Sequence, residues 1–334
     1  MKILMIGGTG NISLPASQAL VARGDDVILY NRGNQPIAGA RQVTGDRYDS
    51  AAFEQQMAEL LAKEGSIDVV IDMICYHPEH GRAVQRALGG RIGQYIFCST
   101  VDVYTKTKSG YPIREDFERE PNPAFEYAYH KAILEKELEA AARQGAFALT
   151  IFRPAATYND SGTPIALPGP GLPLLKRMRQ GKPVIVLGDG NGIWASTHRD
   201  DVAPAFVAAA GNPAAFGKAY NVCGEEWLTW KSYYAAAAQA LGGPELEFVE
   251  IPAKVLVKLT KGEASWCEWN FQYNNIYDNT QAKTDLGYTY RLTWADGVAR
   301  QVAYHDQRGA IDSAADYAPY EQAIVDWRRL ITSL

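Results

Sequence analysis

The sequence predicts a doubly wound α/β fold, in which a parallel sheet is covered by helices on both faces, with a smaller interleaved C-terminal lobe. Short runs rich in Val and Ile alternate with segments of helical spacing through the first 100 residues, as is typical of strands buried on both faces. A glycine-rich turn, GGTGNIS at 7–13, separates the first strand from the first helix. The 334 residues, 47% apolar and 21% charged, can bury a large core.

The elements of the first half follow from this alternation. The expected order is strand 2–6, helix 12–24, strand 26–31, strand 40–46, helix 51–65, strand 67–74, helix 79–89 and strand 94–100. Pro15 falls in the first turn of the first helix, where a missing backbone N–H costs little. The glycine turn therefore lies at a strand-to-helix junction.

The second half changes in character after a strand expected at 147–154. Residues 155–196 are rich in Gly and Pro. The elements expected beyond that strand are helix 172–180, helix 200–210, strand 219–224 and helix 229–241, before an aromatic-rich stretch at 265–279. We expect a main domain at 1–155 with returns near 197–224, and a smaller lobe at 156–196 and 225–334.

Charge and composition narrow the function classes. A net charge of −5 provides no global basic field that would attract nucleic acid or an anionic membrane. The first strand is too short for a signal segment or a membrane span, and the four cysteines form no CxxC pair. We expect a cytoplasmic protein. His77 and His80 have no apparent third ligand nearby in the sequence, so no metal site is expected.

The glycine turn is the first candidate site. Gly7 permits a tight turn, while Gly8 and Gly10 allow the backbone to approach a phosphate closely. The pattern alone is a weak signal, and a plain glycine-containing loop is the alternative. Its position favours a Rossmann-type domain that holds a dinucleotide pyrophosphate at a helix N-terminus. The expected cofactor contacts from this turn are Gly7, Gly8, Thr9, Gly10, Asn11 and Ile12.

The end of the second expected strand bears on the choice of cofactor. An acidic residue here would accept hydrogen bonds from the adenosine ribose of NAD. The chain instead has Asn31 and Arg32, and a cation suits a 2′-phosphate better, so NADP is slightly preferred over NAD. A surface arginine beside a turn is the alternative. Asp46 is a candidate for the adenine amino group or, equally, for capping a turn.

A third candidate site lies on the helix expected around EYAYHKAILEKEL. Tyr127 and Lys131 are four residues apart, so their side chains share one helix face. A nearby ammonium and a positive nicotinamide would favour ionisation of a phenol whose ordinary pKa is about 10. Such a tyrosine exchanges a proton with a substrate hydroxyl. The pair alone is common, but it follows a strand that ends in Ser99 and Thr100.

Together these motifs resemble the extended short-chain dehydrogenase/reductase family, the NAD(P)-dependent epimerases and dehydratases. GGTGNIS is similar to that family's GGTGFIG, and Tyr127 with Lys131 and Thr100 matches its catalytic trio. FRPAATYND at 152–160, GDGNG…HRDDVA at 188–203 and NTQAKTDLGY at 279–288 resemble further family segments in the same order. The resemblance runs from residue 2 to about 305.

The resemblance implies roles for further residues. Asp102 occupies the position of an acid/base glutamate in the family's dehydratases. The remaining implied cofactor contacts are Arg47, Met73, Ile74, Cys98, Ser99, Arg153, Pro154 and Ala155. The implied substrate contacts are Cys75, Asp102, Tyr104, Trp194 and His198. Family members are often dimers, so a homodimer is also expected.

One departure bears on the substrate. Trp194 occupies the position where sugar-nucleotide enzymes of the family carry an arginine for the diphosphate, so the planar bidentate donor is missing. Arg177, Arg179 or Lys182 are possible substitutes, and packing of the smaller lobe is the alternative role of Trp194.

We therefore expect an NAD(P)-dependent epimerase, dehydratase or oxidoreductase that acts on a sugar-related, polyhydroxylated substrate through a transient ketone. The segments ILYNRG and IDMICYHPEHGRAV most resemble the branch of the chloroplast stem-loop-binding proteins, which includes members described as RNA-binding. A non-catalytic NADP-sensing or RNA-binding protein on the same fold is accordingly the alternative, although the acidic balance makes nucleic acid an unlikely partner.

Overall fold

The structure, a computed structural model, describes residues 1–108 and 110–333. The chain divides into two compact units. The first contains Met1–Thr157, Arg199–Cys223 and Tyr277–Tyr290, and the second contains Tyr158–His198, Gly224–Ile276 and Arg291–Leu334.

The first unit is built on a seven-stranded sheet in the described part of the chain, and all of its strand pairs are parallel. In the order in which they pair, the strands are β11 (Lys218–Val222), β6 (Ala148–Pro154), β5 (Ile92–Cys98), β4 (Ile67–Asp72), β1 (Lys2–Ile6), β2 (Asp26–Asn31) and β3 (Arg41–Thr44). The strand order reverses between β1 and β4, which pair with Ile3 opposite Val69. Ligands of doubly wound folds bind at the carboxyl ends of the strands at such a switch point.

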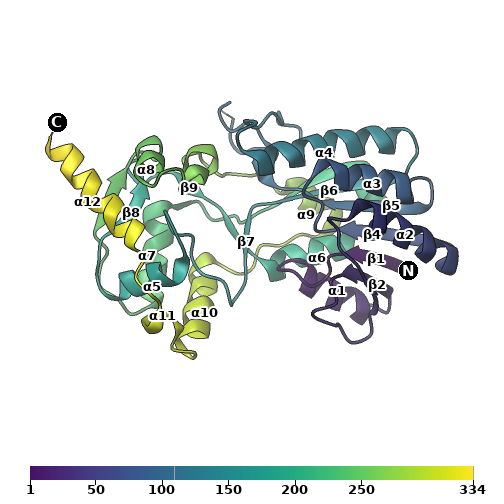
Figure 1. Cartoon of the computed structure of the whole chain (residues 1–334), viewed down its shortest axis with the longest axis horizontal. Helices are drawn as coiled ribbons and strands as arrows, with labels where there is room; N and C mark the ends of the chain where they lie inside the picture. Colours follow the sequence, from purple (N-terminus) through teal and green to yellow (C-terminus); the bar gives the residue numbers. More distant parts are fainter. Residues whose placement is uncertain (109, 334) are drawn as a thin grey trace. The chain divides into compact units, whose positions relative to one another are not determined.

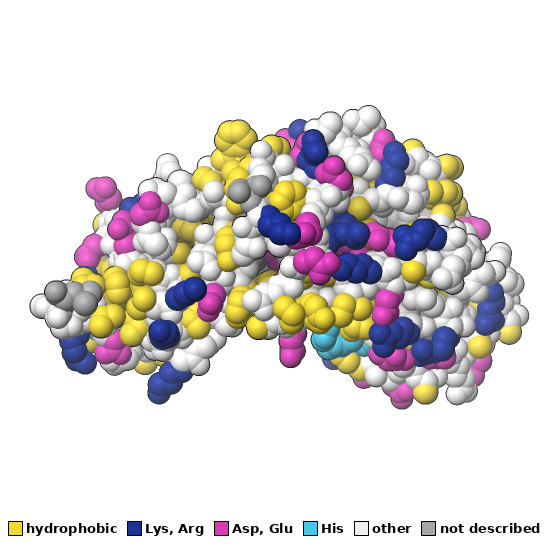
Figure 2. Space-filling view, turned by 90° about the horizontal axis from the view of Figure 1, so that it is seen from above, with side chains coloured by type: hydrophobic (Ala, Val, Ile, Leu, Met, Phe, Trp, Pro, Cys, Tyr) yellow, Lys and Arg dark blue, Asp and Glu magenta, His cyan; other side chains and the backbone are white. Residues whose placement is uncertain are grey.

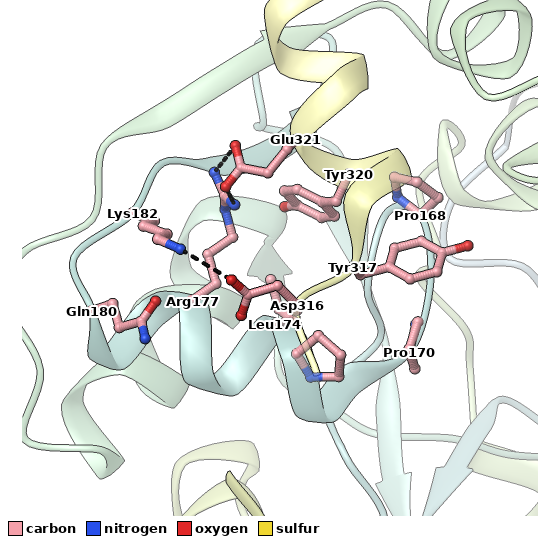
Figure 3. A pocket seen from close by; sticks show the side chains of 11 residues that line it. Pro168, Pro170, Leu174, Arg177, Gln180, Lys182, Asp316, Tyr317, Tyr320 and Glu321 are labelled. Carbon is pink, nitrogen blue, oxygen red and sulfur yellow. Dashed lines mark hydrogen bonds and ion pairs between the residues drawn. The ribbon is translucent and has the colours of Figure 1, made fainter. Parts of the chain in front are cut away.

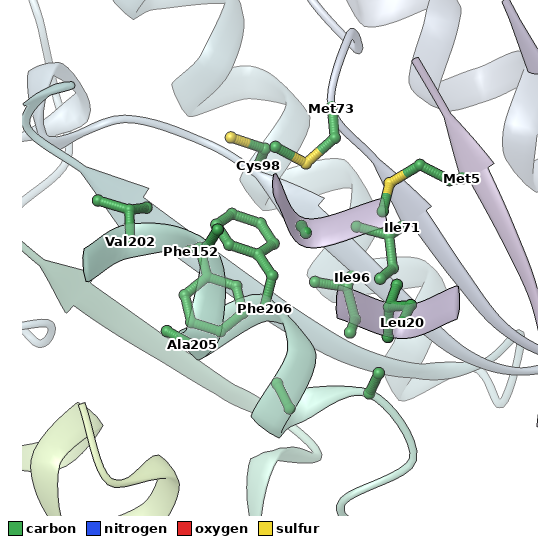
Figure 4. Close-up of a cluster of buried hydrophobic side chains, with 14 of the residues drawn as sticks. Met5, Leu20, Ile71, Met73, Ile96, Cys98, Phe152, Val202, Ala205 and Phe206 are labelled. Atoms are coloured by element: carbon green, nitrogen blue, oxygen red, sulfur yellow. The ribbon is translucent and has the colours of Figure 1, made fainter. Parts of the chain in front are cut away.

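Helices cover both faces of this sheet, as Figure 1 shows for the first unit. The helical elements of this unit are α1 (Ser13–Ala22), α2 (Ser50–Glu64), α3 (Pro78–Leu88), η1 (Val101–Val103), α4 (Glu126–Arg143), α6 (Arg199–Ala209), η2 (Pro213–Ala215) and α9 (Thr280–Leu286). Successive residues of β1 alternate between two buried clusters, because strand side chains point to opposite faces. Met5 packs with Leu20 of α1 and Phe206 of α6 on one face (Figure 4), whereas Leu4 packs with residues of α2, α3 and α4 on the other.

The second unit has smaller sheets and an aromatic interior. Its elements are α5 (Gly171–Arg179), β8 (Val184–Leu187), β9 (Ile193–Trp194), β12 (Leu228–Thr229), α7 (Trp230–Ala240), β13 (Phe248–Ile251), α8 (Ala253–Leu259), the π-helical turn η3 (Cys267–Phe271), α10 (Trp294–Asp306), α11 (Ala310–Ser313) and α12 (Ala318–Thr332). β8 pairs with β13 in parallel, and β9 pairs with β12 in antiparallel. The rings of Tyr233 and Trp294 are stacked, with centroids 4.1 Å apart. β7 (Ala156–Tyr158) and β10 (Ser196–His198) lie where the chain passes between the units.

The predicted fold class is confirmed, since the central sheet is parallel and its helices occupy both faces. One segment differs from the expected division of the chain. Residues 277–290 were expected in the smaller lobe but belong to the first unit, where Asp285 of α9 accepts hydrogen bonds from Lys218 at 2.6 Å and Tyr220 at 3.0 Å. Within the described residues, no helix combines the length and the apolar character that crossing a bilayer requires.

Candidate active site

The glycine turn after β1 has a backbone that larger residues do not adopt easily. Gly7 and Gly8 have φ angles of +108° and +79°, which lie in the region that favours glycine. A Cβ at Gly8 would lie 2.8 Å from Cδ2 of Leu29. The hydroxyl of Ser17 donates a hydrogen bond to the Gly8 carbonyl at 2.9 Å and ties the turn to α1. The turn therefore places backbone without covering side chains next to the start of α1.

The N-terminus of α1 has the properties of an anion-binding helix end. The helix spans ten residues and has no acidic side chain in its first turn, so the positive end of its dipole is uncompensated there. The amide of Gly10 donates to the Ser13 hydroxyl at 2.7 Å. The side-chain amide of Asn11 donates to the Thr157 carbonyl at 2.8 Å and links the turn to the segment after β6.

A cavity of about 400 Å³ opens at this helix end, and all of its lining residues belong to the first unit. The lining residues are Gly10, Asn11, Ile12, Ser13, Met73, Ile74, Tyr76, Cys98, Ser99, Thr100, Tyr127, Lys131, Pro154, Ala155 and Thr157. They come from the carboxyl ends of β4, β5 and β6, from the turn after β1 and from α4. The sequence did not predict Ser13, Tyr76 and Thr157 as site residues.

The hydroxyls of Tyr127 and Thr100 meet in this cavity. Their side chains are hydrogen bonded, and Thr100 also accepts a hydrogen bond from the backbone amide of Asp102 at 3.2 Å. Burial raises the pKa of Tyr127 well above its ordinary value, and the Asp102 carboxylate raises it further, although the hydrogen bond with Thr100 opposes both effects. The phenol is therefore protonated at neutral pH in the absence of a nearby positive charge.

Lys131 lies one helical turn after Tyr127 and is only 1% exposed. Its ammonium donates a hydrogen bond to the carbonyl oxygen of Cys98, at the end of β5, over 2.6 Å. Burial lowers the pKa of this ammonium below its ordinary value. The cavity thus brings together the phenol, the amine and the hydroxyl that the sequence placed on separate segments.

Asp102, the expected second proton-transfer group, is paired with a lysine. Its carboxylate lies 3.1 Å from the ammonium of Lys106, and both side chains are buried. Burial lowers the pKa of Lys106, while the Asp102 carboxylate acts in the opposite direction. Neither side chain lines the cavity. The influence of Asp102 on Tyr127 is therefore electrostatic in this structure.

Four other expected contacts of the first unit lie behind the cavity wall. The guanidinium of Arg153 is bound by Glu135 at 2.7 Å and by the Tyr104 hydroxyl at 2.9 Å. Tyr104 also donates to Asn221 at 2.7 Å. The side chains of Tyr104 and Arg153 are thus internal, because their polar atoms complete a buried network.

The other two expected contacts that do not line the cavity are Arg47 and Cys75. Arg47 donates to the carboxylate of Asp72 at 3.3 Å and to the His80 carbonyl at 2.7 Å, and its side chain is 2% exposed. Cys75 is fully buried, and burial raises the pKa of its thiol to about 12. Neither side chain lines the cavity.

Residues expected near the adenosine end are at the surface or in turns. Asn31 donates to the Gly7 carbonyl at 2.9 Å and accepts from the Gly33 amide at 2.7 Å, so its amide stabilises the turn. Arg32 is exposed, and Asp46 accepts a hydrogen bond from the backbone of Tyr48 at 2.9 Å. Thr9 is half-buried beside the glycine turn.

The two substrate contacts expected in the second unit are interior residues. Trp194 is 2% exposed and stacks on Trp230 with centroids 4.9 Å apart. This packing matches the alternative role of Trp194 in the interior of the second unit, and its contact with a substrate stays a prediction. His198 is 1% exposed, and its Nε2 lies 3.1 Å from the carboxylate of Asp160. In the described chain, no cluster of His, Cys, Asp or Glu has the arrangement of a metal site.

The first unit fits a dinucleotide. A pyrophosphate requires close approach of the backbone and a helix end without negative charge, and the glycine turn with its positive φ angles and the first turn of α1 without acidic residues provide both. An attached nicotinamide ribose requires adjoining space, which the cavity from Gly10 to Lys131 provides. Backbone amides near Asn11 and Ile12 would hold the pyrophosphate, and Thr100, Tyr127 and Lys131 would lie at the reactive end.

Comparisons with known proteins identify the family of the chain. A model of the NAD dependent epimerase/dehydratase family matches residues 3–223. Chloroplast stem-loop binding protein of 41 kDa b from Arabidopsis thaliana is 31% identical over 331 residues, which cover 95% of this chain and 82% of that protein. 2′-Dehydrokanamycin reductase from Streptomyces kanamyceticus is 26% identical over 260 residues, which cover 76% of this chain and 70% of that protein.

Solved structures share the fold. UDP-glucuronic acid 4-epimerase from Bacillus cereus, in complex with NAD, superposes with a TM-score of 0.69 and 19% identity, covering 92% of this chain and 99% of that chain. The matched family, the relatives and the site in the first unit identify an oxidoreductase-type enzyme. The chain belongs to the NAD dependent epimerase/dehydratase family.

Proposed function

We propose that this enzyme oxidises or reduces a sugar-related, polyhydroxylated substrate with a nicotinamide cofactor, and that Tyr127, Lys131 and Thr100 carry the reaction. The observation that carries the proposal is the convergence of these three side chains in one cavity that begins at the N-terminus of α1. The hydrogen bond between Tyr127 and Thr100 places two hydroxyls where one substrate oxygen can contact both.

The raised pKa of Tyr127 sets the direction in which its proton moves most readily. A protonated phenol donates to the oxygen of a substrate ketone as hydride arrives at the carbon. In the reverse direction the phenol must first ionise, which positive charge favours. Lys131 supplies such a charge in the same cavity, and the bound nicotinamide supplies the hydride donor or acceptor.

The net reaction depends on the fate of the transient ketone. A ketone acidifies the neighbouring C–H, so a second base would permit elimination of water, whereas return of hydride to the other face would give an epimer. Asp102 is the residue expected for such a base, but Lys106 holds its carboxylate. The ion pair therefore favours simple redox or epimerisation over dehydration.

The second unit bears on the substrate class. The cations that were possible replacements for the missing diphosphate arginine are each paired with a carboxylate. Arg177 pairs with Glu321 and Lys182 with Asp316 (Figure 3), and Arg179 lies 2.6 Å from Asp306. These pairs and the buried Trp194 support a sugar-related substrate that lacks a nucleoside diphosphate.

The test is turnover of a panel of sugars, amino sugars, their keto forms and UDP-sugars. The absorbance of reduced nicotinamide follows net redox, and chromatography of the sugars follows epimerisation, which leaves the cofactor unchanged. Tyr127→Phe should lower the rate with the best substrate by about 10²–10⁴-fold, the typical contribution of a general acid. Tyr129→Phe is the matched control, because Tyr129 lies on the same helix but is exposed. The absence of turnover with every substrate, or equal rates for Tyr127→Phe and wild type, would rule the proposal out.

We further propose that the cofactor is NADP rather than NAD. The amide of Asn31 is engaged in the turn between β2 and β3, no carboxylate follows β2 directly, and Arg32 is exposed at the same place. A guanidinium there would bind a 2′-phosphate. Arg32→Ala should weaken NADPH binding by roughly tenfold while NADH binding stays unchanged, in fluorescence titrations of the same preparation. Equal losses for both cofactors would contradict the NADP preference.

The stem-loop-binding relative supports a second candidate function, RNA binding on the same fold. The face that Figure 2 shows provides no support for it, because basic and acidic side chains are interspersed there. A structured RNA hairpin should bind only weakly and with a steep loss of affinity as salt is raised. Tight binding at physiological salt in a gel-shift titration would favour this function.

Two further expectations stay predictions, a homodimer and a cytoplasmic location. Light scattering of the purified full-length protein gives the oligomeric state directly, and a monomer at micromolar concentration would contradict the first. Fluorescence microscopy of the tagged protein in its native host would test the second.

A further inference from the structure

The ammonium of Lys131 lies between two aromatic rings. Its Nζ is 4.8 Å from the ring centroid of Tyr76 and 4.8 Å from that of Phe97, and it donates a hydrogen bond to the Cys98 carbonyl at 2.6 Å. Phe97 and Cys98 are the last residues of β5, whereas Tyr76 follows β4. Residues from two neighbouring strand ends thus enclose one cation.

Tyr76 belongs to the cavity as well as to this enclosure. It lines the cavity with Tyr127, and the two rings have centroids 6.5 Å apart at an angle of 43°. The backbone amide of Tyr76 donates to Nδ1 of His80 at 3.3 Å, which connects it to α3. The ring of Tyr76 is therefore held where it contacts the amine of one catalytic residue and faces the phenol of another.

A buried ammonium needs compensation, because desolvation disfavours its charged form. Burial lowers the pKa of Lys131, while Cys98, Cys75, Asp72 and Glu135 act in the opposite direction. The faces of aromatic rings carry negative charge and attract a cation most strongly where water is excluded. Lys131 is 1% exposed, so the two ring faces contribute where this effect is largest.

We propose that Tyr76 is a positioning residue for Lys131, and that the face of its ring keeps the ammonium charged and directed toward the cavity end of β5. This inference rests on the proposed function, because it assigns Tyr76 to the support of a residue that the proposed reaction uses. The aromatic ring is the part required, so Tyr76→Phe preserves the effect, whereas Tyr76→Leu removes it.

The test is a double-mutant cycle on thermal stability, which needs neither substrate nor cofactor. Tyr76→Leu and Tyr76→Phe are each made in the wild-type chain and in Lys131→Met, and the four variants are melted beside their two parents. Tyr76→Leu should lower the melting temperature by roughly 4 °C more when Lys131 is present than in Lys131→Met. Tyr76→Phe should show no such difference. Equal losses from Tyr76→Leu in both backgrounds would overturn the proposal.

A second readout separates this role from simple packing. Tyr76→Leu should weaken NADPH binding in fluorescence titrations, whereas Tyr76→Phe should bind as the wild type does. Equal weakening by both variants would assign the effect to the phenol oxygen instead and overturn the role of the ring. If the coupling with Lys131 persists but no substrate turns over, the proposed function fails and the positioning role stands. If turnover requires Tyr127 and the coupling is absent, the positioning role fails alone.

Discussion

Two buried arginines of the first unit differ in how completely their surroundings bind them. Arg153 of β6 is 1% exposed, and it donates to Glu135 twice, to the Tyr104 hydroxyl and to the Glu115 carbonyl, at 2.7–2.9 Å. Arg47, after β3, is 2% exposed, but only its Nη2 group donates, to Asp72 and His80. Its Nε and Nη1 have no hydrogen-bond partner among the described residues.

The difference shows that burial alone does not reveal what a charged side chain does. Burial lowers the pKa of Arg153, but the carboxylate of Glu135 and the phenol of Tyr104 raise it by more. Despite burial, the pKa of Arg47 is likewise raised, chiefly by Asp72, so the two arginines differ in their hydrogen bonds and not in the direction of this shift. The guanidinium of Arg47 instead lies over the ring of Phe53, with its carbon atom 4.1 Å from the ring centroid. We infer that Arg153 is a structural cation with a full set of partners, whereas Arg47 pairs with the buried Asp72 carboxylate through one edge of its guanidinium and packs on Phe53.

The largest expected effect is that of removing the complete network. Arg153→Met should lower the free energy of unfolding by about 3–5 kcal/mol, because it leaves the carboxylate of Glu135 buried with less compensation. The double variant Arg153→Met, Glu135→Leu should recover a large part of that loss, since Arg119 keeps its second partner Glu139 at 2.7 Å. Urea denaturation measures both. Equal stabilities of the single and double variants would show that Glu135 is not the source of the cost.

Arg47→Met should cost less, about 1–2 kcal/mol, because Asp72 keeps hydrogen bonds from the Tyr95 hydroxyl at 2.8 Å and the Ile74 amide at 3.1 Å. The same variant has a local readout. Burial and, to a smaller extent, the Arg47 cation lower the pKa of His80 to about 4. Removal of the cation should therefore raise that pKa when the imidazole is titrated by NMR. A loss of stability as large as that of Arg153→Met would remove the distinction between the two arginines.

The ion pair between Asp102 and Lys106 extends the comparison to the site, because the Asp102 carboxylate acts on the phenol of Tyr127. Because the Asp102 carboxylate raises the pKa of Tyr127, Asp102→Asn should lower that pKa, and the unpaired ammonium of Lys106 should lower it further. Lys106→Met is the matched control and should act in the opposite direction, since it leaves the carboxylate unpaired. The difference in tyrosinate absorbance between each variant and its Tyr127→Phe counterpart isolates this phenol. Shifts of the same sign in both variants would contradict the electrostatic role of the pair.

How far the sequence predicts the site depends on whether backbone or side chain makes the contact. Gly10 and Ile12 line the cavity because they lie in the turn that the strand-turn-helix pattern predicts, and Tyr127 and Lys131 do so because helical spacing places them on one face. A motif locates Arg153 and Tyr104 along the chain but not the direction of their side chains. The direction of these side chains depends on their hydrogen-bond partners Glu135 and Asn221. These partners are distant in the sequence, and only the fold brings them next to Arg153 and Tyr104.

Tyr76 illustrates the opposite failure. It lies within IDMICYHPEHGRAV, a segment cited only for its resemblance to one family branch, and its position just beyond an expected strand was the signal for a role in the site. Because β4 pairs with β5 in parallel, their carboxyl ends meet at one edge of the sheet, so Tyr76 comes close to Cys98 and thereby to Lys131. The predicted order of parallel strands was therefore enough to place the residues after β4 beside the end of β5. We predicted that strand order but did not include Tyr76 among the site residues. Residues 277–290 were misassigned for a similar reason, since the pairing of Asp285 with Lys218 spans 67 positions.

The smallest expected effect concerns Glu64, which is paired with two cations near the surface, where water competes with the partners for its carboxylate. Glu64 accepts hydrogen bonds from Arg41 and lies 3.1 Å from the ammonium of Lys2, and these partners lower the pKa of its carboxyl to about 2. A carboxyl with a lowered pKa stabilises the fold at pH values above its ordinary pKa, and this contribution is lost as the pH falls toward its pKa in the folded protein.

Glu64→Gln should therefore cost stability at neutral pH, and the difference in the free energy of unfolding from wild type should shrink between about pH 4.5 and 2. Urea denaturation across this range measures the difference, and a constant difference would show that packing, not charge, is the source. Because water screens exposed pairs, the loss of stability from Glu64→Gln should remain below that of Arg47→Met even at neutral pH. The contribution of a charged side chain to the stability of the first unit therefore depends both on its burial and on how completely it is paired.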